Sequence, residues 1–420
     1  MAQHNAVRSR SAPVAVRRGA GRSRRPAGVR PMVTVWLAWL VLMTGVNLAT
    51  PLYAVYADRF RFSSLVLTLV FAAYALTLVI SLMLFGRLSD RFGRRVVGFA
   101  GLLVACGGLA LFAAASSIVW LFAARAVQGL AVGMVSGAAT AALVELDPAG
   151  EARRPALLAG LAQAAGSGAG PLVAGMLAQW APAPLRLSFL VLLGATVVAA
   201  AFVLTLPRGG GGGEPWRIQL PRVPGEILGD FLRVGLTAGI VWAALALCLS
   251  IVPSYSAQLL RTDDLALLGA MAALALAASC VAQVVSRRFH GRPQPAQARG
   301  LVVLAAGLAA LVLAAPLHSL PLLLVSALAI GVGHGLSFLD AQAELNDMAP
   351  SKRRGEITAA FIVCIYVLVG GSVVASGLLG LRLSLQASVG TVAVVLAAAA
   401  LVTAVWQARS GRRVRGHRRA

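Results

Sequence analysis

The chain has 420 residues, of which 59% are hydrophobic and only 12% are charged, and its mean hydropathy is +0.83. About a quarter of the residues in a soluble domain are charged, so this composition excludes a water-soluble fold. The formal net charge of +23 alone would indicate a nucleic-acid-binding protein, but the distribution of the charges along the chain favours a membrane protein without a nucleic-acid partner.

Residues 1–31 are rich in arginine and lack an apolar run, which predicts a disordered basic tail. The apolar segment that begins near Val33 is too long for the core of a signal peptide, so we expect it to remain as the first membrane span. A helix of about 20 apolar residues crosses a bilayer. Twelve such segments are predicted, at residues 33–56, 63–86, 96–115, 118–141, 155–180, 184–206, 232–258, 264–286, 299–316, 319–343, 356–380 and 384–406.

The glycine run Gly209–Gly213 lies midway along the chain and is typical of a flexible linker. It predicts a six-helix bundle at 32–207, a linker at 208–231, a second six-helix bundle at 232–408 and a basic tail at 409–420. A shift of 202 residues aligns the two halves, because it places Gly129 on Gly331, Gly133 on Gly335, Glu145 on Asp347 and Pro148 on Pro350. The sequence therefore predicts an all-α membrane protein with two pseudo-symmetric halves.

Basic residues alternate between the loops of this topology. The loops and tails on the side of the N-terminus contain 31 of the 37 Arg and Lys residues, and those on the other side contain five. Because cytoplasmic loops carry the excess of basic residues, both termini are predicted to lie in the cytoplasm.

The segment between the second and third spans contains two glycines, an aspartate and several arginines. Gly86 is expected to let helix backbones approach closely, and the carboxylate of Asp90 to pair with an arginine or accept backbone hydrogen bonds. The segment resembles the signature loop of the major facilitator superfamily, which implies a loop that latches the two halves in the outward-open state. A basic loop that only sets the membrane orientation is the alternative. The residues that carry the resemblance are Gly86, Asp90, Arg91, Gly93, Arg94 and Arg95.

Arg125 is the only Arg or Lys in the interior of a predicted span, since Arg186, Arg233 and Arg299 lie at the ends of theirs. Because an intramembrane charge is costly, we expect it to face the bundle interior or water, in contact with Asn47 of the first span. The segment Arg125–Gly129 resembles a second motif of the same superfamily. The alternative is an arginine near the outer face whose side chain reaches the membrane surface.

The fifth span resembles the antiporter motif of the drug-efflux branches of this superfamily, through Gly166, Gly170, Pro171 and Gly175. Pro171 is expected to kink the helix, and the glycines to form a close helix–helix contact. Leu157 stands where the motif has an upstream glycine, and Ala174 replaces a glycine of its final pair. The motif favours export over import, and ordinary packing of small residues is the alternative.

Three acidic residues of the tenth span, Asp340, Glu344 and Asp347, follow at i, i+4 and i+7 and so share one side of the helix. With Glu145 at the end of the fourth span, they are predicted to form a cytoplasmic charge stripe that exchanges salt bridges during transport. A charged helix end at the membrane surface is the alternative. The candidate basic partners of the stripe are Lys352, Arg353 and Arg354.

His334 lies deeper in the tenth span, where it could bind substrate or a proton, or pack as a neutral side chain. We expect a central substrate cavity, and an Arg125 without a deep acid nearby favours neutral or anionic substrates. Many proton-driven exporters of the superfamily have an acid in the first span, and none lies in the apolar part of it here. The expected cavity residues are Asn47, Tyr74, Arg125, Gln128, Trp242, Ser250, Ser254 and His334.

No phosphate-binding or catalytic motif lies in a suitable context, so we expect no enzyme activity, no cofactor and no metal. The sequence predicts a monomeric exporter of small amphipathic compounds that works by alternating access within a lipid bilayer and is coupled to protons or another ion. An importer or uniporter of a small metabolite and a non-transporting sensor on the same fold are the alternatives. Arginine outnumbers lysine 36 to 1, which indicates a high-GC bacterial genome and hence the bacterial inner membrane.

Overall fold

The computed structural model describes residues 29–86, 88–147, 153–208, 221–286, 293–314, 316–350 and 353–417, whose regular secondary structure is entirely helical. The helices of the first half are α1 (Val29–Asn47), the 3-10 helix η1 (Thr50–Leu52), α2 (Tyr53–Phe60), α3 (Ser64–Phe85), α4 (Leu88–Phe92), α5 (Arg94–Ala113), α6 (Ile118–Leu146), α7 (Arg153–Trp180) and α8 (Leu187–Val203). Those of the second half are the 3-10 helix η2 (Gly225–Ile227), α9 (Leu228–Leu260), α10 (Leu265–Ser286), α11 (Pro293–Ala314), α12 (Leu320–Met348), α13 (Arg354–Leu379) and α14 (Leu385–His417).

These helices agree with the predicted twelve membrane crossings. Eleven helical segments of the described residues are long and apolar enough to cross a membrane, and α8 is an apolar helix of 17 residues. The segments η1 and α2 continue the first crossing after α1, and the short α4 lies in the loop after α3. Each crossing is helical because a helix satisfies its own backbone hydrogen bonds where no water can do so.

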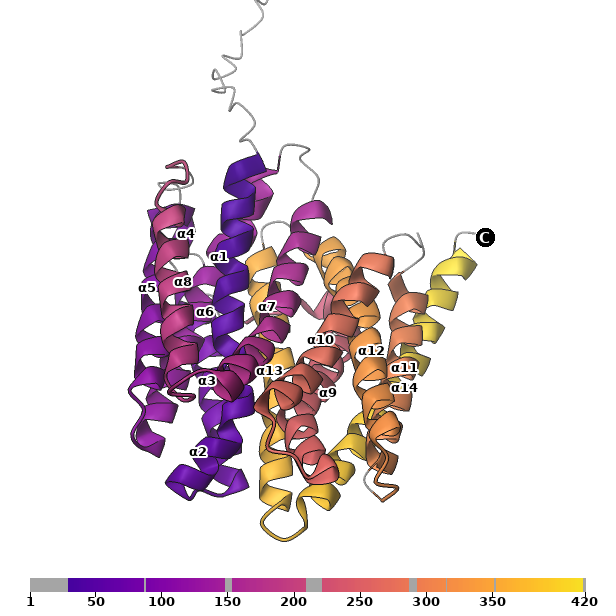
Figure 1. Ribbon diagram of the computed structural model, residues 1–420. Coiled ribbons are helices and arrows are strands. Elements are labelled where there is room, and N and C mark those ends of the chain that lie inside the picture. The colour runs from indigo at the N-terminus through magenta and orange to yellow at the C-terminus, as the bar shows by residue number, and fades with distance from the viewer. Residues whose placement is uncertain are drawn as a thin grey trace, which may run out of the picture.

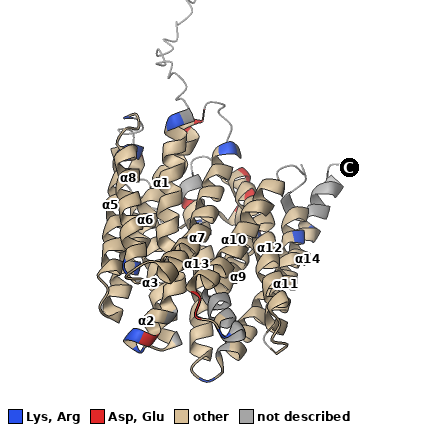
Figure 2. Cartoon of the chain, in the orientation of Figure 1, with Lys and Arg blue, Asp and Glu red and all other residues tan. Residues whose placement is uncertain are grey.

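The helices form two bundles side by side, α1–α8 from the first half and α9–α14 from the second (Figure 1). Across the interface, α7 packs on α10 and α3 packs on α13. The start of α1 and the end of α14 lie at one end of the molecule, here called the termini side, and α2 lies at the opposite end, here called the far side (Figure 1). Charged residues gather mainly at these two ends and leave a broad apolar zone between them (Figure 2).

The internal repeat is visible in the packing of the aligned glycines. In the first half, Gly129 and Gly133 of α6 pack on α3, and in the second half Gly331 and Gly335 of α12 pack on α10. An ideal Cβ on any of the four would lie less than 3.0 Å from an atom of the neighbouring helix. The aligned glycines thus bring equivalent helices into close contact in each half, α3 with α6 in the first and α10 with α12 in the second.

Helix boundaries differ from the prediction at several places. The helix α9 begins at Leu228, so Arg233 lies within the helix and not at the edge of the span. The helix α11 begins at Pro293, and α14 continues to His417 through most of the expected basic tail. The predicted disordered tail up to residue 28 and the glycine run at 209–213 lie outside the described residues.

Candidate functional site

Arg94, the first residue of α5, holds the predicted signature loop together. Its guanidinium contacts the Asp90 carboxylate and the Ser89 hydroxyl (2.5 Å) from α4, and the Glu145 carboxylate (3.0 Å) from the end of α6. Gly93 between α4 and α5 has a φ of 89°, a backbone conformation that a residue with a Cβ rarely adopts. Arg94 therefore ties α4, α5 and α6 together at the termini side.

The other loop residues also contact the first bundle. Arg95 donates to the carbonyl of Leu206, just after α8, at 3.3 Å, whereas Arg91 is exposed. The carbonyl of Gly86 lies against α6, where an ideal Cβ on Gly137 would come within 2.8 Å of it. The close backbone approach expected at this glycine therefore occurs between the end of α3 and α6.

Arg125 and Gln128 of α6 cap the C-terminal end of α1. Pro51 lacks an N–H and its ring clashes with the preceding helical turn, so α1 ends before it. The last carbonyls of α1 then need other donors. Nη1 of Arg125 donates to the Val46 carbonyl (2.6 Å), and Nε2 of Gln128 donates to the Gly45 carbonyl (3.0 Å). Because both side chains are buried within the bundle, these bonds replace those that solvent would supply and stabilise the break in the first span.

Arg125 reaches the end of the first span as expected, but the described residues show no hydrogen bond between its side chain and that of Asn47. The carbonyl freed by the break in α1 takes the donor instead. The Arg125 side chain is 1% exposed, donates from Nε to the Tyr53 hydroxyl (2.6 Å) and from Nη1 to Gln128 (3.0 Å), and has no carboxylate within 4.0 Å among the described residues. Its charge is stabilised by aromatic faces, with the guanidinium carbon 4.9–5.8 Å from the ring centres of Tyr53, Phe71, Tyr74 and Phe112.

The cap at α1 makes Arg125 sensitive to a conservative change. A lysine keeps the charge but lacks the planar fork that reaches the Val46 carbonyl and the Tyr53 hydroxyl together. We expect Arg125→Lys to lower the free energy of unfolding by at least about 2 kcal/mol, because buried acceptors lose their donors. Thermal unfolding of the purified protein in detergent measures this, with the exposed Arg186→Lys as the matched control. A melting temperature equal to that of the wild type would contradict the cap.

The predicted antiporter-motif helix, α7, lies between the two bundles. An ideal Cβ on Gly166 or Gly170 would lie less than 3.0 Å from backbone atoms of α1, in the same bundle. One on Gly175 would lie equally close to the Leu265 carbonyl of α10, in the other bundle. The carbonyl of Pro171 faces Gly269 of α10 in the same way. The glycines of α7 therefore form two close contacts, one with each bundle.

The structure does not gather the predicted cavity residues around one space. Arg125 and Gln128 face the inside of the first bundle, where Gln128 lines a cavity between α1, α5, α6 and α8 with room for about one water molecule. They point there because the carbonyls of α1 bind them. The predicted side chains of Ser250 and Ser254 lie outside the described residues.

Of the other cavity candidates, Tyr74 lies at the interface between the bundles, and Trp242 and His334 lie in the second bundle. Tyr74 of α3 reaches across the interface, with its ring centre 6.2 Å from that of Tyr366 of α13. Trp242 of α9 and His334 of α12 contact each other within the second bundle, with ring centres 4.6 Å apart. Tyr366 was missed by the sequence reasoning, because nothing in its own segment distinguishes it from an ordinary apolar-helix tyrosine.

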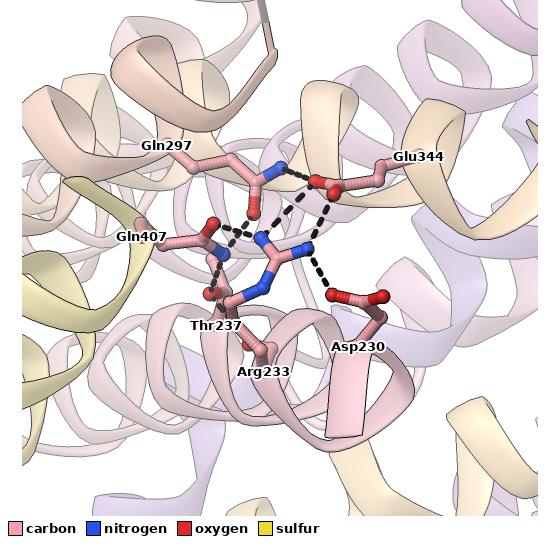
Figure 3. Close-up of polar contacts among 6 residues, drawn as sticks. All are labelled: Asp230, Arg233, Thr237, Gln297, Glu344 and Gln407. Carbon is pink, nitrogen blue, oxygen red and sulfur yellow. Dashed lines mark hydrogen bonds and ion pairs between the residues drawn. The ribbon is translucent and has the colours of Figure 1, made fainter. Parts of the chain in front are cut away.

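A buried polar cluster, also missed, joins α9, α11, α12 and α14 at the termini side of the second bundle (Figure 3). Nη2 of Arg233 donates to Glu344 at 2.5 Å and to Asp230 at 3.0 Å. Two glutamines complete it, since Gln297 donates to Glu344 at 2.7 Å and Gln407 contacts Arg233 and Gln297. We call it the Arg233 cluster, and its members are Asp230, Arg233, Thr237, Gln297, Glu344 and Gln407.

The Arg233 cluster corrects two predictions. Arg125 is not the only basic residue inside a span, because Arg233 is 2% exposed within α9. Glu344 pairs with Arg233 of α9, which was not among its predicted partners, because its side chain points into the bundle, whereas Asp347 is exposed and Asp340 is half-buried. The candidate partner Lys352 and the side chain of the candidate Arg354 lie outside the described residues. The spacing of Asp230, Arg233 and Thr237 on one side of α9 was the available signal.

Comparison with known proteins agrees with this architecture. Residues 35–374 match the family model of the Major Facilitator Superfamily. The human organic anion transporter MFSD10 (TETRAN) is similar with a TM-score of 0.69 at 18% identity, over 91% of this chain and 100% of that one. The nucleoside transporter NupG has a TM-score of 0.67 at 14% identity, over 91% and 99% of the two chains.

A bacterial homolog of the human lysosomal transporter Spinster, solved in an inward-facing and occupied conformation, has a TM-score of 0.67 at 13% identity, over 92% of this chain and 97% of that one. At these identities, the solved structures establish a shared fold. No curated protein matches the chain. The family match covers most of the chain, from the first span to the eleventh. The chain therefore belongs to the major facilitator superfamily, a family of membrane transporters and not of enzymes.

Proposed function

We propose that the protein is a secondary active transporter that exports small amphipathic compounds by alternating access and is driven by proton entry. The observation that carries this proposal is the position of α7, whose Gly166 and Gly170 contact its own bundle while Gly175 contacts the other. A contact built mainly from backbone and small side chains has few long side chains to disengage, so it suits two bundles that rock against each other. We call the α7–α10 contact the bundle seam.

The contact between α3 and α13 supports the same movement from the other side of the interface. Tyr74 meets Tyr366 there, and an ideal Cβ on Gly377 would lie less than 3.0 Å from Thr68. The proposed substrate path runs between this contact and the bundle seam. A compound with an aromatic or apolar body would separate the two tyrosines and replace their ring contact with its own.

The direction and setting of transport are also part of the proposal. The resemblance of α7 to the antiporter motif favours export, and the excess of basic residues favours a cytoplasmic termini side in the bacterial inner membrane. The loop at Asp90 is the proposed latch between the halves. In this conformation its described contacts join helices of the first bundle, so the latch would engage the second bundle in another conformation. We propose a monomer as the working unit.

Dye uptake into inside-out vesicles tests this function. Ethidium, Nile red and carboxyfluorescein provide a cation, a neutral compound and an anion, each measured with and without an imposed pH gradient. We expect gradient-dependent uptake of at least one dye, reduced at least about tenfold in Asp90→Asn and in Arg125→Ala, because each change removes a buried or paired charge. Asp263→Asn, which neutralises an exposed acid on the far side, is the matched control.

Each other outcome points away from the proposal. Uptake that does not need the gradient would contradict proton coupling and favour a uniporter. Transport in the opposite direction would contradict export and favour an importer. A folded protein that moves none of the dyes would favour the non-transporting sensor.

A further inference from the structure

His334 is a titratable side chain enclosed within the second bundle. It is 1% exposed, and its ring lies 4.6 Å from that of Trp242 of α9 and 5.4 Å from that of Phe338 on its own helix. Its Nδ1 lies 2.8 Å from the hydroxyl of Ser279 of α10, a contact that the close α10–α12 packing at Gly335 permits. Its Nε2 is buried and has no hydrogen-bond partner in the described structure.

The hydrogen bonds around Ser279 are compatible with a neutral His334 ring that carries its hydrogen on Nε2. Nε2 of Gln283 donates to the Ser279 hydroxyl oxygen at 3.2 Å, so the hydroxyl is free to donate its own proton to Nδ1 of His334. The imidazole is then neutral, with its hydrogen on Nε2. Nδ1 is therefore a basic nitrogen that accepts a hydrogen bond from one exchangeable hydroxyl proton.

This chain of hydrogen bonds leads to the bundle seam. Gln283 is 1% exposed, and an ideal Cβ on Gly160 of α7 would lie 3.0 Å from its Oε1. That oxygen is buried and has no hydrogen-bond partner in the described structure. An amide oxygen without a partner is costly in an apolar contact, and water supplies the missing donor when the contact opens. Gln283 is thus the polar group through which an opening seam reaches Ser279 and His334.

No charged side chain contacts the His334 ring among the described residues, since its neighbours are Trp242, Ser279 and Phe338. The bundle seam helix α7 brings glycines and alanines to this region. The described titratable side chains on the helices that pack around α12, none of them with a hydrogen bond or ring contact to His334, are Asp230, Arg233 and Cys248 on α9, Cys280 on α10, Arg299 on α11, and Asp340, Glu344 and Asp347 on α12 itself. A proton added to His334 would therefore change the net charge of its immediate surroundings, with no neighbouring charge to offset it.

We propose that His334 carries the coupling proton and releases it to the bundle seam through Ser279, while Gln283 positions that hydroxyl. When the seam opens, the imidazolium passes its Nδ1 proton to the Ser279 oxygen, and the serine gives its own hydroxyl proton to a water molecule of the seam, which leaves as hydronium. The serine is restored, the ring becomes neutral, and the closed, dry seam favours that neutral ring. This inference rests on the proposed proton-driven export and names the residue that carries its proton.

The test separates coupling from movement of the substrate. Gradient-driven uptake and dye exchange without a gradient are measured for the dye of the ethidium, Nile red and carboxyfluorescein panel that the wild type accumulates most. We expect His334→Gln to reduce gradient-driven uptake at least about tenfold while dye exchange stays within about twofold of the wild type, because exchange needs no net proton transfer. Ser279→Ala should also reduce gradient-driven uptake. His318→Gln, on an exposed histidine outside the bundle core, should change neither rate.

Two results would overturn this inference alone. Gradient-driven uptake by His334→Gln within about twofold of the wild type would show that another group carries the proton. An equal loss of uptake and exchange would show that His334 only packs. A wild type without any gradient-driven uptake would instead remove the proposed function, and this inference with it.

Discussion

Replacing Gly269 by alanine is expected to reduce transport by about 5- to 150-fold. The added methyl group would overpack the bundle seam and destabilise its closed state by about 1–3 kcal/mol. An ideal Cβ on Gly269 would lie less than 3.0 Å from the Pro171 carbonyl, and one on Gly175 equally close to the Leu265 carbonyl. Both obstacles are backbone atoms, which cannot rotate away as a side chain can. The two helices belong to different bundles, so the strain falls on the closed seam and not on either bundle core.

Dye uptake into vesicles and thermal unfolding, measured together, check this expectation. Gly269→Ala should lose transport while its melting temperature changes little, since each bundle keeps its own core. The matched control is Gly390→Ala on α14, where an added Cβ would meet nothing within 4 Å. Normal transport by Gly269→Ala would mean that the transport cycle does not need the closed seam seen here. A large loss of stability would mean that the seam holds the fold together and does not act as a moving contact.

Hydropathy was sufficient to predict the number of membrane crossings, because a lipid-exposed backbone must satisfy its own hydrogen bonds and the length of each apolar run decides whether it spans. Helix ends were less predictable. Arg233 lies at the edge of an apolar run, where a charged residue is expected to belong to a loop. In the structure, α9 begins before Arg233, and the side chain is buried. Charge alone does not reveal whether a basic residue at such an edge faces water or a buried acid.

The partners of the buried polar side chains could not be predicted, because they depend on which helices meet. Arg125 was expected to be buried, but its acceptors include a backbone carbonyl freed by the break at Pro51, which is not a property of any side-chain motif. Gln297 and Gln407 are separated by 110 residues and look unremarkable in sequence, yet they bond to each other at 2.6 Å. Motif resemblance located the loop at Asp90 and the helix α7, whereas the partners of the buried polar side chains are determined by tertiary packing.

The Arg233 cluster yields the largest expected effect on stability. Glu344→Gln keeps the shape of the side chain and removes its charge, which leaves the 3% exposed guanidinium of Arg233 with the exposed Asp230 as its acidic partner. Breaking a buried ion pair on one side costs about 3–5 kcal/mol, so we expect the apparent melting temperature in detergent to fall by about 6–20 °C for a unit the size of one bundle. Asp230→Asn removes the exposed partner of the same guanidinium, and we expect it to cost less than about 1 kcal/mol.

A double variant separates the charge from the packing. If the cost of Glu344→Gln comes from an unbalanced buried charge, then Arg233→Met combined with Glu344→Gln should recover most of the lost stability, because no charge remains to be buried. If the double variant is as unstable as the sum of the two single variants, the cluster stabilises the bundle through its hydrogen bonds with Gln297 and Gln407 and not through the ion pair. The first result would make Arg233 and Glu344 one electrostatic unit that pins α9 to α12, so that the second bundle moves as a rigid body against the seam.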